Sequence, residues 1–224
     1  MIDLEITLLK IENISPVNYY YIASSGGMRS SSFIGDIALK YATLKQMGEL
    51  DYPSPTKFKP TYEELNNFDF WYTVAVNEKT AMSEGNGTIF MKNLTRNTMH
   101  GIDYNGTNKY PNAREGSTMY KNFYFQQPIL PGNIFYTYLI SKDKMEIPPA
   151  LRVGNGKTGL LKLVKITHSD KVKAVLNRYS IENIMGKKVS SEGLNYTEHM
   201  LLQYFLIGMF TKEQLGELYG KWIN

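Results

Sequence analysis

The first ten residues, MIDLEITLLK, decide how the fold begins. Apolar side chains fall on every second position, at residues 2, 4, 6 and 8. This period of two predicts a β-strand with one buried face. The next periodic stretch runs from Phe33 to Gly48, where apolar residues recur at three and four positions before the glycine. It predicts a helix, and we expect a serine of SSGGMRSSS (residues 24–32) to cap it.

Later segments add further strands to this strand and helix. Runs rich in aromatic and β-branched residues predict strands at residues 70–76, 88–94, 133–141 and 160–167, the first two as a hairpin. A capping box at residues 61–64 predicts a short helix. We expect the tail from Thr197 to be helical, with a last helix opened by the capping box Thr211–Gln214. The order of elements predicts an α+β fold around a mainly antiparallel sheet, as one domain over residues 1–224 with a helical extension at about 178–224.

Composition excludes several classes of protein. With 42% apolar and 21% charged residues the chain has the make-up of a folded protein, and its sequence has no run of about 20 apolar residues such as a membrane helix needs. The absence of cysteine excludes disulfides, thiolate zinc sites, iron–sulfur clusters and cysteine nucleophiles. The early acidic residues Asp3 and Glu5 are unlike a signal peptide, so we expect a cytoplasmic protein without a membrane partner.

The net charge of +4 hides two basic segments. Residues 92–122 hold five cations against two carboxylates, a net charge of +3, and residues 150–178 hold seven cations against one, a net charge of +6. The rest of the chain therefore carries −5. Two basic segments on an acidic body are typical of a polyanion-binding surface, although solvated lysines would give the same count.

The more basic segment contains a glycine-rich turn. LRVGNGKT, residues 151–158, departs from a phosphate loop because LLKLVKI (160–166) predicts a strand where that loop opens a helix. We therefore do not expect nucleotide hydrolysis. Glycines beside cations can still bind polynucleotide phosphates, because backbone N–H groups can approach closely; the alternative is an ordinary tight turn. The candidate residues here are Arg152, Gly154, Asn155, Gly156 and Lys157.

The other basic segment lies in a long stretch with little periodicity, residues 95–131. Within it, MYKNFYF (119–125) predicts one arm of a projecting hairpin. Aromatic residues alternate with cations, a combination that suits single-stranded RNA, although the aromatic residues could instead pack in the core. The candidate RNA-binding residues here are Arg96, Lys109, Arg114, Tyr120 and Lys121. Arg29, before the first helix, is a further candidate for binding an anion, or else an exposed loop arginine.

Catalytic patterns are scarce. The histidines His100, His168 and His199 are scattered and lack the spacing of metal ligands, so we expect no metal and no cofactor. The sequence contains no serine-nucleophile elbow. His100 could act as a general base, but an ordinary loop histidine explains it as well.

Two stretches carry a resemblance to a known family. FIGDIALKYATL (33–44), above all its residues 35–42, and ALRVGNGKTGLLKL (150–163) occur in an order of elements that resembles the Csc-one branch of the Cas-five family. This is the CRISPR-associated subunit that binds the 5′ end of the guide RNA in type I-D Cascade. The resemblance covers residues 1–167 and leaves the tail unmatched.

The resemblance implies an RRM-like, or ferredoxin-like, domain with a glycine-rich loop and a β-hairpin thumb at about residues 95–131. It implies a non-catalytic subunit that holds the 5′ handle of the guide RNA, the crRNA. Its implied protein partners are the repeated backbone subunit and the large subunit, near the protospacer-adjacent motif, with target double-stranded DNA there as a further partner. Some relatives cleave precursor RNA, so an endoribonuclease that uses His100 or His168 stays open as an alternative, as does a protein-interaction module whose Tyr-rich loop docks on a partner.

Overall fold

Strand β1 (Glu5–Asn13) lies at the middle of the central sheet. The computed structural model describes residues 4–18, 22–24, 27–50, 62–82, 99–103, 122–154, 157–167, 171–189, 195–197 and 204–223. The central sheet has six strands in the order β4-β8-β1-β10-β9, with β5 also paired to β8. All its pairs are antiparallel, which confirms the expected α+β fold. The other strands are β4 (Phe70–Tyr72), β5 (Val76–Asn77), β8 (Ile134–Ser141), β9 (Ala150–Val153) and β10 (Gly159–Ile166).

The strand order is that of a ferredoxin-like sheet. Strand β1 is followed by helix α1 (Asp36–Met47) and then by β4, β8 and β10, and in space β1 lies between β8 and β10. This arrangement follows from a β-α-β-β-α-β chain order. Where that order has its second helix, between β8 and β10, the chain instead forms β9, which pairs with β10 at the sheet edge.

Helix α1 begins and ends at glycines. Gly35 is its N-cap, without a side-chain hydrogen bond, and Gly48 ends it in the left-handed conformation, with φ of 79°. The expected serine cap is therefore wrong. The serines are buried and bond to other backbone groups: the Ser30 hydroxyl donates to Val17 O at 3.1 Å and the Ser31 hydroxyl to Phe33 O at 2.9 Å. They hold the chain that enters the helix.

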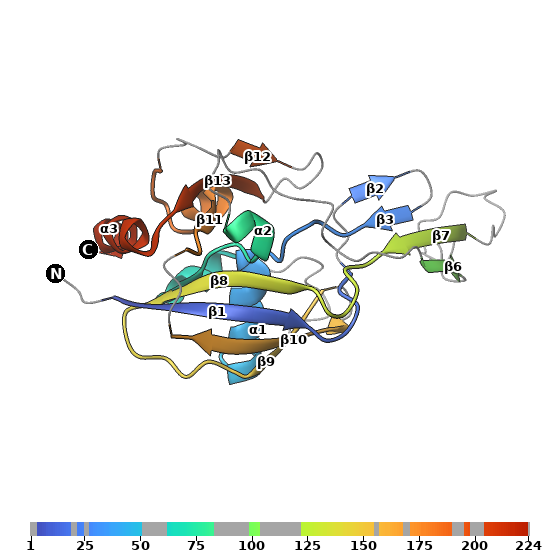
Figure 1. Ribbon diagram of the computed structural model, residues 1–224, viewed down its shortest axis with the longest axis horizontal. Coiled ribbons are helices and arrows are strands. Elements are labelled where there is room, and N and C mark those ends of the chain that lie inside the picture. The colour runs from blue at the N-terminus through green and yellow to red at the C-terminus, as the bar shows by residue number, and fades with distance from the viewer. Residues whose placement is uncertain are drawn as a thin grey trace.

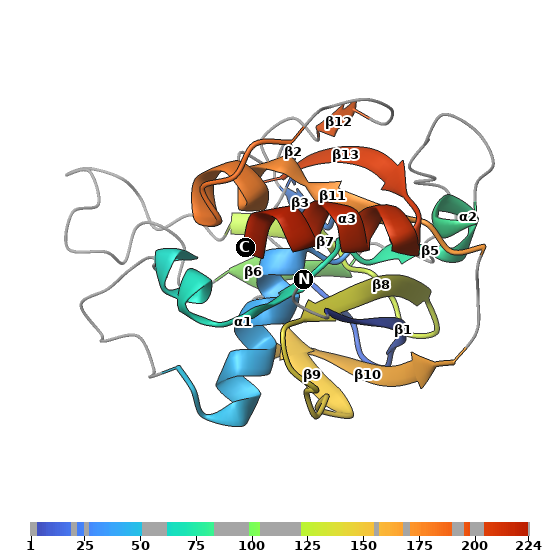
Figure 2. The same ribbon diagram turned by 90° about the vertical axis from the view of Figure 1, so that its left-hand side faces the viewer.

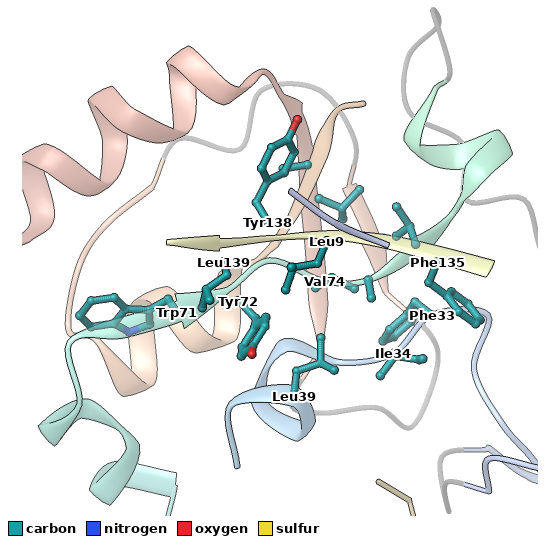
Figure 3. Packing of buried hydrophobic residues seen from close by; sticks show 14 of the residues in the cluster. Leu9, Phe33, Ile34, Leu39, Trp71, Tyr72, Val74, Phe135, Tyr138 and Leu139 are labelled. Carbon is teal, nitrogen blue, oxygen red and sulfur yellow. The ribbon is translucent and has the colours of Figure 1, made fainter. Parts of the chain in front are cut away.

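Apolar residues of α1 and the sheet meet in the core (Figure 3). Leu39 of α1 and Leu9 of β1 are both fully buried. In Figure 3, Leu9, Tyr72 and Leu139 point toward Leu39, while Tyr138 points to the other side of the sheet. Successive side chains of a strand alternate between faces, so α1 covers one face of the sheet.

The stretch predicted as one strand at residues 70–76 is divided between partners. Strands β4 and β5 pair with β8, but between them Val74 bridges to Val175 and Ala75 to Ile34. Strand β5 then runs into the short helix α2 (Glu78–Ala81), capped by the Asn77 side chain, which accepts a hydrogen bond from the Thr80 N–H at 3.0 Å. The strand expected at residues 88–94 lies outside the described residues. The helix expected after residues 61–64 is a 3₁₀ helix, Tyr62–Asn67.

The expected helical tail is wrong in part. A second sheet has the order β11-β13-β12, formed by β11 (Ala174–Asn177), β12 (Asn195–Thr197) and β13 (Phe205–Phe210), and Ser180–Ile184 forms a π-helical turn. Phe205 and Gly208, expected on a helix face, lie in β13. A short apolar run can form either a helix or a strand. Here residues 205–210 form a strand because β11 and β12 pair with them on both sides. Gly208 also has φ of 56°, which a right-handed helix does not use.

The last helix, α3 (Lys212–Ile223), is confirmed together with its capping box. The Thr211 N–H donates to Gln214 Oε1 at 2.8 Å, and the Gln214 N–H donates to the Thr211 hydroxyl at 3.3 Å. Helix α3 and the second sheet lie together on the β8 side of the central sheet (Figure 2). In the described part of the chain, no helix is long and apolar enough to cross a membrane.

A third sheet lies beyond the C-terminal end of β1 (Figure 1). Its order is β2-β3-β7-β6, formed by β2 (Ile22–Ser24), β3 (Gly27–Arg29), β6 (Met99–Asp103) and β7 (Asn122–Gln127). Strands β6 and β7 pair antiparallel and β3 pairs parallel to β7. Strands β6 and β7 pair as the two arms of a hairpin would, but residues 104–121 between them lie outside the described residues, so the expected thumb stays a prediction.

The motif at residues 35–42 attaches α1 to the second sheet. A Cβ on Gly35 would overlap the hydroxyl end of the buried Tyr204 ring, so a larger residue there requires Tyr204 to move. The buried Asp36 carboxylate accepts a hydrogen bond from Asn177 Nδ2 at 3.0 Å, and burial raises the pKa of Asp36 to about 6. One turn later Lys40 is also buried, and its Nζ donates to Phe68 O at 2.8 Å and lies 4.4 Å from the Trp71 ring centroid. Burial lowers the pKa of Lys40 to about 7.

Replacing Lys40 should change how stability depends on pH. The folded state releases the Lys40 proton near pH 7, whereas the unfolded chain keeps it until about pH 10.5, so between these values the unfolded state binds more protons. The free energy of unfolding should therefore rise with pH from 7 to 9, by at most about 1.4 kcal/mol per pH unit for one proton. Urea unfolding at pH 7, 8 and 9 should show this rise for the wild type and lack it in Lys40→Met. Lys144→Met, at an exposed lysine, should keep the wild-type slope; equal slopes for all three proteins would contradict the assignment.

Candidate nucleic-acid interface

The stretch Asn13–Asn18, here called the exit segment because it continues from β1, is hydrogen-bonded on both sides. On one side the Ser15 hydroxyl donates to Thr158 O at 2.8 Å and accepts from the Leu160 N–H at 2.7 Å. On the other side Val17 and Ile129 exchange backbone hydrogen bonds of 2.9 and 3.0 Å. The exit segment therefore joins the start of β10 to the chain that leaves β7.

Asn13 adds hydrogen bonds between the exit segment and the chain that leaves β7. Its buried side chain donates from Nδ2 to Ile129 O at 3.0 Å and to Leu130 O at 2.8 Å. The Ser30 hydroxyl bonds to Val17 O from the chain that leaves β3. Strands β3 and β7, which pair with each other, are thus both anchored where they end, and the hairpin of β6 and β7 is held at its base.

The glycine-rich turn lies directly against the exit segment. Gly154 has φ of 80°, and a Cβ there would come within 2.7 Å of Asn18 O. At Gly159 a Cβ would come within 2.8 Å of Val17 Cγ2. Both glycines are needed for this close approach, and Gly154 is needed also for its left-handed backbone.

Lys157 has an unusual backbone in this turn. Its φ of 54° is the only positive value among the described residues other than glycine, and its N–H donates to Gly154 O at 3.1 Å. A non-glycine residue in this region costs roughly 1–2 kcal/mol, and such strain is concentrated at binding sites. The Lys157 side chain is exposed.

Three of the predicted residues lie together on this turn. Arg152, exposed on β9 opposite Leu160, precedes Gly154 and Lys157 on the connection between β9 and β10. As expected, the residues after Thr158 form a strand, β10, and no phosphate-loop helix. The Arg29 backbone lies in β3 opposite Gln127, next to the Ser30 anchor. The structure therefore brings the turn and the base of the hairpin to one end of the central sheet (Figure 1).

The other predicted residues lie outside the described residues: Arg96, Lys109, Arg114, Tyr120, Lys121, Asn155 and Gly156. Of the residues considered for cleavage, His100 has its backbone in β6 opposite Phe125, and His168 also lies outside the described residues. No group of three or more His, Asp or Glu side chains that could hold a metal ion occurs in the described ranges.

Sequence reasoning missed the residues that build this end of the sheet. Asn13 and Ser15 carry no charge and belong to no binding motif, and their role depends on partners more than 110 positions away in the chain. The one local signal is that polar residues replace the apolar pattern where β1 finishes.

Alanine at Gly154 should be more harmful than alanine at Gly48. The two glycines have nearly equal φ values, 80° and 79°, so the backbone strain of about 1–2 kcal/mol is matched. Nothing lies within 4 Å of a Cβ at Gly48, whereas at Gly154 it meets Asn18 O. Gly154→Ala should therefore lose roughly 1–3 kcal/mol more in urea unfolding than Gly48→Ala. Equal losses would mean that the turn does not pack on the exit segment.

Comparisons with known proteins give a family and a likeness to solved structures. The family model described as type I-D CRISPR-associated protein Cas5/Csc1 matches residues 4–204. No curated protein sequence matches the chain. Among solved structures, a chain of the cryo-EM structure of the Type III-B Cmr-beta bound to cognate target RNA and AMPPnP is similar at a TM-score of 0.41 and 9% identity. The similarity covers 96% of this chain and 88% of that chain.

Proposed function

Because this chain belongs to the type I-D CRISPR-associated Cas5/Csc1 family, we propose that it is a non-catalytic subunit that holds the 5′ handle of the guide RNA. Membership of the family makes it a subunit of a CRISPR effector complex. The proposal concerns what the subunit binds, and it assigns the handle phosphates to the turn between β9 and β10. Guide RNA is made in the cytoplasm, so the proposal places the protein there.

One observation carries the proposal: the exit segment joins the glycine-rich turn to the base of the β6–β7 hairpin. Of the two basic segments of the sequence, residues 92–122 (+3) contain β6 and the start of β7, and residues 150–178 (+6) contain the turn. Cations brought to one end of a sheet neutralise neighbouring phosphates of one strand of RNA. We propose that the hairpin, held at its base by the exit segment, lies over a nucleotide as the implied thumb does.

Within the turn, Arg152 and Lys157 are the cations, and Gly154 supplies the left-handed backbone with which the turn packs on the exit segment. Asn155 and Gly156 complete the proposed phosphate cradle. On the hairpin side we propose Arg96, Lys109, Arg114, Tyr120 and Lys121 as RNA contacts, with Arg29 beside them on β3.

The same proposal gives the chain its protein partners. A subunit at the 5′ end of the guide RNA caps the row of repeated backbone subunits and meets the large subunit near the protospacer-adjacent motif, where target double-stranded DNA enters. We propose these contacts from the family alone. We propose no catalytic role for His100, because the family resemblance implies a non-catalytic subunit.

Charge reversal in the turn should release the guide RNA. Arg152→Glu with Lys157→Glu removes two phosphate contacts, so affinity should fall at least tenfold. The slope of log affinity against log salt should become shallower by about 1.4 for single-stranded RNA. Filter binding of a guide RNA with its 5′ handle to the assembled complex, at several salt concentrations, measures both quantities.

The matched control reverses two exposed lysines of α3, Lys212→Glu with Lys221→Glu, which adds the same charge at the opposite end of the molecule. This control should keep affinity within about twofold and leave the slope unchanged. If the turn variant behaves like the control, or if the RNA that copurifies with the wild-type complex has no common 5′ end, the proposed function is wrong.

A further inference from the structure

The face of the central sheet opposite α1 is covered over one half only. At the covered half the Tyr138 hydroxyl donates to Val172 O at 2.8 Å, Gly216 of α3 lies against Ile6, and the Trp71 and Tyr219 rings are 6.3 Å apart. These contacts come from the second sheet and α3. They bury Tyr138 and its cross-strand neighbour Leu8.

The other half of this face lies toward the end of β1 and is here called the open half-face. Side chains alternate between the two faces along β1. Leu9 and Ile11 are buried on the face that α1 covers, so Lys10 and Glu12 lie on the open half-face. The cross-strand register adds Ile134, Lys162 and Val164. Ile134, Lys162 and Val164 are exposed, and Lys10 and Glu12 are partly exposed.

Apolar side chains gather on the open half-face. Val164 is 42% exposed, Ile134 36% and Ile14, which continues the same alternation beyond β1, 44%. They are three of the five large apolar side chains that are exposed in the described part of the chain, the others being Met47 and Met82. Exposed apolar residues that gather on one surface, with charges between them, mark an interaction site.

The chemistry of the open half-face favours a protein over RNA. Unpaired bases bind by stacking on aromatic rings, whereas the exposed apolar residues here are aliphatic. The one half-buried aromatic ring, Tyr136, has its hydroxyl bonded to Glu78 Oε1 at 3.4 Å. The three cations on this face, Lys10, Lys162 and Arg152, outnumber its two carboxylates, Glu12 and Glu78. A complementary surface therefore has aliphatic side chains with carboxylates beside them.

We propose that the open half-face docks a neighbouring protein subunit of the effector complex, through a strip of aliphatic side chains flanked by carboxylates. The inference rests on membership of such a complex and not on the handle-binding role. Ile14, Ile134 and Val164 form its apolar centre, and Lys10 and Lys162 meet the partner's carboxylates. The surface borders the glycine-rich turn at Arg152, so the docked subunit lies beside the proposed RNA path.

The first test places carboxylates on the apolar centre. Ile134→Asp with Val164→Glu, in the affinity-tagged chain expressed with the other subunits and the guide RNA, should reduce recovery of one subunit about tenfold or more after ribonuclease treatment. Met47→Glu with Met82→Glu is the matched control, since these side chains are similarly exposed elsewhere, and it should leave every subunit at its wild-type ratio. Unchanged recovery in both variants would overturn the proposal.

Two further measurements do not depend on the folding of the double variant. Lys162→Glu, at an exposed position, should weaken recovery of the same subunit, and more so at low salt than at high salt. A photo-crosslinking amino acid in place of Val164 should join to a peptide of a protein subunit that contains aliphatic residues beside Asp or Glu, while the same crosslinker in place of Met47 should not.

Crosslinks from position 164 to the guide RNA would show that the face binds RNA and would overturn the docking proposal. Crosslinks to a peptide rich in lysine and arginine would overturn its charge assignment. Failure of the handle-binding proposal looks different, since it leaves RNA affinity unchanged in the turn variant and does not affect subunit recovery here.

Discussion

The hydrogen bonds of the exit segment are the constraint on which the arrangement of this protein depends. Strand β1 is central, so its continuation can reach both neighbours, and Ser15 bonds the start of β10 while Val17 bonds the chain beyond β7. Each side alone would be an ordinary turn contact. Together they fix where a glycine-rich turn and a hairpin lie relative to one another, although the two are distant in sequence. Gly154 and Gly159 follow from this constraint, because any larger residue would push the turn away.

The second constraint is the attachment of α1 to the second sheet. Gly35 leaves room for Tyr204, and Asp36 accepts a hydrogen bond from Asn177, so one end of the helix is fixed to β11 and β13. Both charged residues in this motif, Asp36 and Lys40, are buried and keep polar partners. Burying a carboxylate and an ammonium group costs free energy even when they are hydrogen-bonded, as their shifted pKa values indicate. Of the two stretches that carry the family resemblance, residues 33–44 therefore act in packing, whereas residues 150–163 include the proposed RNA contacts of the turn.

Elements with a clear period were predicted correctly from sequence, and those that depend on distant partners were not. The alternation before Asn13, the apolar spacing of α1 and the capping box at Thr211 each carry local information, and the strand and both helices are confirmed. The single buried face expected for the strand is wrong, because Leu8 and Leu9 are buried on opposite faces of β1 between two layers. The run from Phe205 to Phe210 has no decisive period, and only its partners β11 and β12 make it a strand. At the candidate site, Arg152 and Lys157 were recognisable by charge and by glycine neighbours. Ser15 and Asn13 were not, because their function is to bond residues far along the chain.

In the two proposals, the division of the sheet face gives one small subunit a separate surface for each of two kinds of partner. The second sheet and α3 cover the half of the face near the start of β1 and leave the half near its end open. Had the second sheet covered the whole face, only the end of the sheet with its turn and hairpin base would remain for binding. The two proposed surfaces meet at Arg152, which is exposed on β9 opposite Leu160. A partner docked on the open half-face would remove water around this arginine and so strengthen its attraction to a phosphate. Docking and RNA binding would then favour each other, and by linkage each would raise the affinity of the other by the same factor.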